Sequence, residues 1–462
     1  MKNTYLDLIE QTFYFPTEGF RVENGNLLWN DIPLMTLIGE YGTPLRITYL
    51  PKISSQIQKA KKNFKEAMDE TGYKGKYYYC YCTKSNHFSF VLEEALKNDI
   101  HIETSSAFDI DLIEKLYDRG WTNKDTFIVH NGFKPKNYTE RITGLLNKGF
   151  KNVIPVLDNM SEVDNYSGVD GEINFGIRIA TDEEPNFEFY TSRLGIRYND
   201  IIPFYKEKIE PNPKFNLKML HFFINTGIKD ATYYWSELRK SVRMYAELKK
   251  INPDLKYMNI GGGFPIRNSI HFDYDYNYMT KEIVKSILSE CRDAGVEEPD
   301  IFTEFGKFTV GESGAIIYSI LQEKLQNDIE LWYMINSSLM TTVPDVWGIG
   351  ERFILLPVNK WNNEYQKVNI GGLSCDGHDY YNSEAHANQV YLPNLDQKSP
   401  MHIGFFHVGA YQESLSGYGG TKHCLIPSPQ HVLVKGIENG KIISELFAEK
   451  QTVESMLNIL GY

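Results

Sequence analysis

Short apolar runs alternate with amphipathic segments between about residue 45 and residue 310. The apolar runs are rich in aromatic and β-branched residues, which favours strands over helices. They predict strands at Tyr77–Lys84, Ile100–Thr104, Thr126–Asn131, Val153–Leu157, Ile173–Ile179, Leu217–Phe223, Tyr257–Ile260 and Ile301–Glu304. Apolar residues at three- and four-residue spacing predict intervening helices such as Phe88–Lys97, Ala107–Tyr117, Tyr233–Lys250 and Met279–Ala294.

Eight strand–helix repeats in one run predict an α/β fold with a closed, parallel (β/α)8 barrel of the TIM type. Functional residues of such barrels lie at the carboxyl ends of the strands. After about residue 310, the runs become short and are separated by Pro and Gly, which predicts a mostly β second domain. We therefore expect the barrel at 46–310 and the β domain at 311–462. The N-terminal segment at 1–45 is expected to become part of the β domain.

Composition narrows the class of protein. A chain of 462 residues with 42% hydrophobic content can fill more than one core. The net charge of −12 argues against nucleic-acid binding, because that requires basic residues to neutralise phosphates. Five cysteines without framework spacing predict reduced thiols in the cytosol. With neither a signal peptide nor a membrane-spanning run in the sequence, we expect a cytoplasmic protein without membrane partners. We also expect no metal site.

Lys84 ends the first predicted strand, after a run of tyrosines and cysteines. A rigidly held, partly desolvated lysine has a lowered pKa, which favours the free amine that attacks a carbonyl. That is the property an imine-forming cofactor requires. The alternative is a solvated lysine at the end of a strand, and residues at later strand ends decide between the two.

Two later strand ends carry matching chemistry. Gly261, Gly262 and Gly263 directly follow the seventh strand, and successive glycines let backbone amides approach an anion such as phosphate. Glu304 ends the eighth strand, where a carboxylate could keep a pyridine nitrogen protonated. Read separately, the glycines could be a plain turn and the glutamate an ion-paired acid.

Lys84, the glycine loop, Glu304 and a distant Cys375-Asp376 pair occur in an order that resembles the fold-type III pyridoxal-phosphate decarboxylases, over nearly the whole chain. Three longer stretches are similar to the biosynthetic arginine decarboxylases: His130-Asn131-Gly132-Phe133-Lys134, Pro344-Asp345-Val346-Trp347 and the run 405–413. The chain resembles a compact branch of that group. The resemblance implies an alanine racemase-like barrel, pyridoxal 5'-phosphate as cofactor, and a lyase of polyamine biosynthesis.

The resemblance also implies roles for individual residues. Lys84 would carry the cofactor and reprotonate the product, and Cys375 would act near the site of protonation. The implied cofactor-binding residues are Lys84, Glu103, Arg178, Phe223, Thr226, Gly261, Gly262, Gly263, Glu304, Lys307 and Tyr411. Cys375 and Asp376 would come from the partner subunit, which implies a homodimer with shared active sites; a higher oligomer stays open.

The cofactor-binding residues depart from the family pattern at three positions. Phe223 stands where the family usually has a histidine that stacks on the cofactor ring, and a phenyl ring can stack but cannot donate a hydrogen bond. Thr226 replaces a phosphate-binding serine conservatively. Lys307 replaces an arginine, which keeps the charge but loses the bidentate fork.

The substrate loop departs as well. Arginine decarboxylases usually read Cys-Asp-Ser-Asp, whereas this chain reads Cys375-Asp376-Gly377-His378-Asp379. Replacing an acid with His378 should weaken a guanidinium site, while a histidine could donate to the neutral ureido group of citrulline. Asp379 restores an acid one residue later, a pattern that also resembles ornithine decarboxylases. His378 could equally be solvent-facing loop variation.

We therefore expect a decarboxylase of a long-chain L-amino acid. Arginine, giving agmatine, is favoured by resemblance; citrulline, giving N-carbamoylputrescine, is the close alternative, and ornithine and lysine rank lower. A catalytically inactive homologue that regulates a decarboxylase is disfavoured because Lys84 and Cys375 are present. A racemase is disfavoured because the resemblance extends through the decarboxylase loop.

Overall fold

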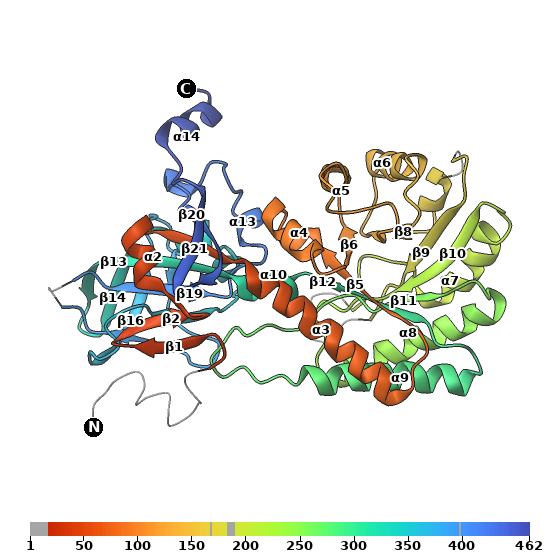
Figure 1. Ribbon diagram of the computed structural model, residues 1–462, viewed down its shortest axis with the longest axis horizontal. Coiled ribbons are helices and arrows are strands. Elements are labelled where there is room, and N and C mark those ends of the chain that lie inside the picture. The colour runs from red at the N-terminus through yellow and green to blue at the C-terminus, as the bar shows by residue number, and fades with distance from the viewer. Residues whose placement is uncertain (1–16, 167–168, 183–189, 397–398) are drawn as a thin grey trace. The chain divides into compact units, whose positions relative to one another are not determined.

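The computed structural model describes residues 17–166, 169–182, 190–396 and 399–462 (Figure 1). The chain divides into two compact units. The first comprises residues 1–52, 266–273 and 310–462, and the second comprises residues 53–265 and 274–309.

The second unit is the expected barrel. Eight parallel strands close in the order β10-β11-β12-β5-β6-β7-β8-β9, and β10 pairs with β9. The strands are β5 (Tyr77–Cys82), β6 (His101–Thr104), β7 (Ile128–His130), β8 (Val153–Leu157), β9 (Ile173–Arg178), β10 (Phe215–His221), β11 (Tyr257–Asn259) and β12 (Asp300–Phe305). The predicted eight-stranded parallel barrel is therefore confirmed.

Helices follow the strands in alternation, except after β8, which is followed by a 3-10 helix at Glu162–Tyr166. They are α3 (Leu50–Thr71), α4 (Ser89–Leu96), α5 (Ala107–Asp118), α6 (Lys136–Asn147), α7 (Tyr198–Phe204), α8 (Thr232–Ile251), α9 (Tyr276–Ala294) and α10 (Lys307–Val310). Local chemistry sets some of these boundaries: α5 begins at a capping box, in which Ser106 and Asp109 satisfy each other's backbone N–H groups. In the described part of the chain, none of the helices combines the length and apolar character needed to cross a membrane.

Apolar side chains from different strands meet in a small cluster within the barrel. Cys80, Val129, Val156, Met219 and Phe302 are all buried there, together with partly buried aromatic rings. Because side chains alternate between the two faces of each strand, one face fills this core and the other packs on the helices. The core fixes the strand register and with it the positions of the strand ends.

The first unit is mostly β, as predicted. Its main sheet runs β17-β16-β14-β13-β4-β20-β21, with β15, β18 and β19 paired off this path, and β1, β2 and β3 form a separate sheet. The strands are β1 (Phe20–Glu23), β2 (Asn26–Trp29), β3 (Ile32–Pro33), β4 (Leu45–Tyr49), β13 (Gly314–Gln326), β14 (Glu330–Ile335), β15 (Ile354–Pro357), β16 (Tyr365–Gly371), β17 (Tyr380–Tyr381), β18 (Val390–Pro393), β19 (His402–Phe406), β20 (Gln430–Glu438) and β21 (Lys441–Ala448). The helices of this unit are α2 (Leu34–Tyr41), α11 (Leu339–Thr342), α12 (Asp345–Gly348), α13 (Gln412–Leu415) and α14 (Val453–Leu460).

Two segments of the expected barrel range belong to the first unit instead. Residues 46–52 do so because β4 pairs with β13 and β20 of the β sheet. Residues 266–273 also do so, and Ile270 packs in the apolar core of that unit. The barrel range of 46–310 therefore overestimates the barrel by these two segments.

Candidate active site

Lys84 and Glu103 meet at the carboxyl ends of two adjacent barrel strands. The strand β5 ends at Cys82, two residues earlier than expected, and Thr83–Ser85 form a short 3-10 turn. This turn is closed by the Ser85 hydroxyl, which donates to the Cys82 carbonyl at 2.8 Å. Cys82 pairs with Glu103 in β6, so Lys84 Nζ lies 3.4 Å from Glu103 Oε1. The lysine side chain is 44% exposed and that of Glu103 is fully buried.

Burial raises the pKa of Glu103 to about 7, although the charge of Lys84 opposes the shift; the negative charge of Glu304 adds to it. A carboxyl with this pKa exchanges its proton near neutral pH. Its second oxygen, Oε2, is buried and has no hydrogen-bond partner among the described residues. This carboxyl can therefore form a hydrogen bond with a further polar group that is placed at the barrel end.

Glu103→Gln is expected to change how stability depends on pH in the cofactor-free protein. The folded-state pKa of about 7 lies above the ordinary value of 4.5, so the neutral carboxyl stabilises the fold below about pH 4.5, and this contribution is lost as the pH rises through about 7. Glutamine stays neutral throughout. The free energy of unfolding of the variant, relative to wild type, should therefore rise by about 1–3 kcal/mol between about pH 5 and pH 8.

Urea denaturation at several pH values measures this difference. Glu66→Gln is the matched control, because Glu66 is an exposed glutamate in the i,i+4 pair with Lys62 on α3. A constant difference between Glu103→Gln and wild type across the pH range would show that Glu103 has an ordinary pKa.

Glu304 lies on β12 at the centre of a buried polar network. The Asn259 amide donates to Glu304 Oε1 at 2.6 Å, and the Asn131 amide donates to Oε2 at 3.2 Å. His221 Nε2 lies 3.4 Å from Oε2. Arg178 donates in turn to the Asn131 side-chain oxygen at 3.2 Å. Side chains from three other strand ends thus contact one carboxylate, and Arg178 from a fourth supports one of them.

Burial would raise the pKa of Glu304, but His221, Lys84 and the Asn259 amide outweigh it and lower the pKa to about 2. Burial also lowers the pKa of His221, against the opposing charge of Glu304. The amide donors favour the ionised carboxylate directly, so Glu304 carries a negative charge throughout the neutral range. A permanent buried carboxylate of this kind can hold a pyridine nitrogen in its protonated form.

The glycine loop after β11 is packed so closely that side chains are excluded. A Cβ added at Gly262 would lie 2.1 Å from the Glu304 carbonyl oxygen, and one at Gly263 would lie 2.7 Å from Gly227 Cα. Gly261 and Gly263 also have φ values of 67° and 111°, which L-residues rarely adopt. The backbone of two turns therefore lies bare at this barrel end, as a phosphate cradle requires.

Phe223, Thr226 and Arg178 lie at the same end of the barrel. Phe223 follows β10, and its ring centroid is 5.8 Å from the Arg178 guanidinium carbon. The Phe223 backbone is held by Thr181, whose hydroxyl donates to its carbonyl at 2.8 Å. Thr226 is partly buried next to Gly227. Their predicted contacts with a flat ring and its phosphate stay a prediction.

Asn131, Asn259 and His221 contact Glu304 at this barrel end and were not predicted from the sequence as site residues. Each stands at or directly after the end of a barrel strand, next to apolar residues that predict the strand itself. A polar residue at that position in several strands was the available signal. Their shared partner, Glu304, becomes apparent only when the barrel closes.

Three further predicted site residues lie in different parts of the chain. Lys307 begins α10 directly after β12 and is partly buried. Tyr411, in the first unit, precedes α13 with a φ of 68°. Cys375 is exposed in a loop of the first unit.

Asp376 and Asp379 of that loop differ in environment. Asp376 Oδ1 accepts hydrogen bonds from the His378 backbone at 2.8 Å and from its imidazole Nδ1 at 3.1 Å. Asp379 is buried instead, and its two oxygens accept backbone N–H groups of Leu339 at 2.8 Å and Ser374 at 3.0 Å. Asp379 therefore organises the loop, and its predicted contact with substrate stays a prediction.

The barrel end fits pyridoxal phosphate by several independent features. It combines a lysine amine, a bare glycine backbone for the phosphate and an ionised carboxylate for the pyridine nitrogen. Arg178 Nε is also buried there without a hydrogen-bond partner among the residues that the structure describes. An anionic ring substituent would satisfy this buried donor, because an unpaired buried polar group is costly.

Comparisons with known proteins agree with this arrangement. Residues 52–311 match the family described as pyridoxal-dependent decarboxylase, pyridoxal binding domain. A biosynthetic arginine decarboxylase of Prochlorococcus marinus is 22% identical, over 92% of this chain and 83% of that protein. The enzyme of the same description from Escherichia coli K12 is 21% identical, over 85% of this chain and 77% of that protein.

Solved structures show the same fold. The biosynthetic arginine decarboxylase of Campylobacter jejuni has a TM-score of 0.82 at 21% identity and covers 96% of this chain and 89% of its own. A diaminopimelate decarboxylase of M. jannaschii, in complex with L-lysine, has a TM-score of 0.78 at 18% identity and covers 94% of this chain and 96% of its own. The expected fold-type III architecture is therefore confirmed.

Proposed function

Because this chain belongs to the pyridoxal-dependent decarboxylase family, we propose that it converts L-arginine to agmatine and carbon dioxide. The observation that carries the chemistry is the meeting of Lys84, Glu103, Glu304 and the glycine loop at one barrel end. The observation that favours arginine is the match to biosynthetic arginine decarboxylases over most of the chain. Agmatine would then enter polyamine biosynthesis.

Pyridoxal phosphate, when bound, supplies an electron sink for the electron pair released as the bond between the α-carbon and its carboxylate breaks. The bare backbone of Gly261–Gly263 binds the phosphate, and Thr226 adds a hydroxyl donor. Glu304 holds a proton on the pyridine nitrogen, because its pKa of about 2 keeps the carboxylate ionised. Lys84 Nζ anchors the cofactor and can hold a proton beside the reacting carbon.

We assign the recognition of the distal end of the substrate to Asp376. Its carboxylate lies in an exposed loop and its pKa is lowered by hydrogen bonds from His378. An ionised carboxylate is the group that pairs with a guanidinium. The exposure of Cys375 and the partial exposure of Asp376 support a homodimer in which this loop completes the site of the partner subunit. Cysteine usage supports a reducing, cytoplasmic location.

Product analysis tests the proposal. Incubation of the enzyme with arginine should yield agmatine and carbon dioxide in equal amounts, as determined by chromatography and gas detection. Release of urea or ornithine without agmatine would contradict it, because those products come from cleavage of the guanidino group.

Citrulline is the second candidate, and the hydrogen bonds around Asp376 favour it. Oδ1 already accepts two donors from His378, so a guanidinium cannot form its paired contact with both oxygens without displacing one of them. Citrulline carries a neutral ureido group, which does not require a paired contact with both carboxylate oxygens. His378 has a 77% exposed side chain and can reach a ligand at the same place.

His378→Asp is expected to shift specificity towards arginine. The substitution removes an imidazole donor and adds a carboxylate next to Asp376. If His378 contributes to recognition, the ratio of kcat/KM for arginine to that for citrulline should rise about tenfold or more, since ~1.4 kcal/mol corresponds to one decade.

Steady-state kinetics with both substrates on both proteins measures this ratio. His378→Asn is the matched control, because it removes the imidazole without adding charge. An unchanged ratio in His378→Asp would show that His378 faces solvent and would remove the argument for citrulline.

A further inference from the structure

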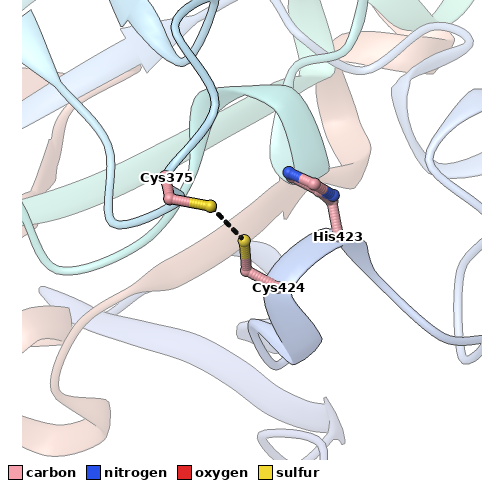
Figure 2. A group of neighbouring side chains, drawn as sticks. All are labelled: Cys375, His423 and Cys424. Carbon is pink, nitrogen blue, oxygen red and sulfur yellow. Dashed lines mark hydrogen bonds between the residues drawn. The ribbon is translucent and has the colours of Figure 1, made fainter.

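Two thiols and an imidazole meet on the surface of the first unit, away from its apolar cores. Cys375 Sγ lies 3.6 Å from Cys424 Sγ, and the ligand atoms of Cys375, His423 and Cys424 all lie within 4.8 Å of one another. Figure 2 shows the two sulfur atoms facing each other and the His423 ring beside them. All three residues are exposed.

The separation of the sulfur atoms is compatible with a metal site, and the two cysteines do not form a disulfide. Two thiolates bound to tetrahedral zinc at about 2.3 Å are about 3.8 Å apart. In a disulfide the two sulfur atoms are about 2.05 Å apart. The observed 3.6 Å is close to the first value, so a zinc ion would need only a small adjustment of the thiols.

The backbone that carries His423 and Cys424 is held in an unusual conformation. Both residues lie in the short turn His423–Leu425, in which Cys424 and Leu425 each have a φ of 53°. Non-glycine residues rarely adopt such angles, and two in succession store strain. This turn places two consecutive side chains, one thiol and one imidazole, close to Cys375.

The opposite side of the cluster is also fixed. Asp379 holds the loop that carries Cys375: its side chain accepts the Ser374 N–H at 3.0 Å, and its backbone carbonyl accepts the Gly372 N–H at 2.8 Å. Asp376 Oδ2 lies 4.0 Å from His423 Nε2. A carboxylate at this place either supplies a fourth ligand or orients the imidazole, and both roles favour a bound cation.

We propose that Cys375, His423 and Cys424 form a binding site for a zinc-class divalent cation, with Asp376 as the adjacent carboxylate. Two cysteines and one histidine are ligands that zinc prefers, whereas calcium and magnesium require oxygen ligands. Each thiol gives up its proton to solvent as it binds the metal, so no oxidant is required. Disulfide formation is the alternative outcome of the test.

Zinc at this site inhibits the enzyme, a consequence that rests on the proposed function. Cys375 is the residue assigned near the site of protonation, and Asp376 is assigned to the distal end of the substrate. A metal ion that binds Cys375 and attracts Asp376 withdraws both from the substrate. Removing the metal restores them.

Metal content tests the site without using activity. Holoenzyme is reduced, stripped with a chelator and titrated with zinc, and bound metal is measured by mass spectrometry after dialysis. Wild type should retain about one zinc per chain, and Cys424→Ala and His423→Ala should each weaken retention about tenfold or more. Cys291→Ala, which removes a buried thiol on α9, should retain zinc as wild type does.

Three results would overturn the site: wild type that retains no zinc, a Cys424→Ala protein that retains it fully, or a Cys375–Cys424 disulfide that forms in place of metal uptake. Circular dichroism shows whether each variant is folded. Two variants on separate residues keep the test valid if one of them fails to fold.

Inhibition is measured on the same proteins. Zinc should lower turnover of wild type, a chelator should restore it, and Cys424→Ala should need about tenfold more zinc for the same effect. Zinc that is bound without any change in turnover overturns the inhibitory consequence alone. If the protein binds zinc but turns over none of arginine, citrulline, ornithine and lysine, the proposed function is contradicted. The proposed metal site is then still supported.

Discussion

The Lys84→Ala protein is expected to lose turnover by about 10³-fold or more, and to lose the near-ultraviolet and visible absorbance of lysine-linked pyridoxal phosphate. Lys84 Nζ lies 3.4 Å from Glu103 at the barrel end, and no other amine is assigned this role. Its side chain is 44% exposed, so its removal should leave the barrel folded. Absorbance spectra and carbon dioxide release measure the two effects separately.

Lys84→Arg is the matched control for charge. Arginine keeps a cation beside Glu103 but does not supply a nucleophilic amine at neutral pH. Both variants should therefore be inactive while their circular dichroism matches that of wild type. Wild-type turnover in either variant would contradict the assignment of Lys84.

Mixing inactive Lys84→Ala subunits with inactive Cys375→Ala subunits is expected to restore about a quarter of the wild-type activity. In a symmetric dimer with shared sites, random exchange makes about half of the dimers mixed, and each mixed dimer contains one intact site of two. Neither parent preparation alone should show this activity. The measurement is carbon dioxide release before and after subunit exchange.

Subunit exchange itself must be demonstrated, for example with tagged subunits that are purified together. Pairing Lys84→Ala with Glu304→Gln is the matched control, because both substitutions lie in the same barrel and no intact site can form. Exchange without recovered activity in the first pair would show that each site lies within one chain.

The barrel was predictable because its signals are local. Apolar runs and helical spacing identify strands and helices within windows of about ten residues. Eight repeats in succession then leave a closed parallel barrel as the natural solution. The same reasoning places Lys84 and Glu304 at strand ends, since each directly follows or ends an apolar run.

The network around Glu304 was not predictable from local pattern. Asn131, Asn259 and His221 are 173, 45 and 83 residues away in sequence, and they meet only because the closed barrel brings their strand ends together. An isolated asparagine at a strand end is ordinary turn chemistry. Nothing in one such position reveals the carboxylate that it will contact.

The substrate loop shows a second limit of prediction from the sequence. Asp376 and Asp379 look equivalent in sequence, but Asp376 is partly exposed, whereas Asp379 is buried and accepts backbone N–H groups of α11 and of the loop itself. Cys424 lies 49 residues beyond Cys375, and an irregular turn brings their thiols together. Such contacts depend on loop conformation, which periodicity does not determine. The segment 266–273 joins the β unit for the same reason.

Decarboxylation of arginine is tested most directly by carbon dioxide release from arginine, citrulline, ornithine and lysine, measured in parallel on the purified holoenzyme. We predict the highest kcat/KM for arginine, the next highest for citrulline, and far lower values for ornithine and lysine. A highest value for citrulline, ornithine or lysine, or release of carbon dioxide from none of the four, would contradict the proposed decarboxylation of arginine.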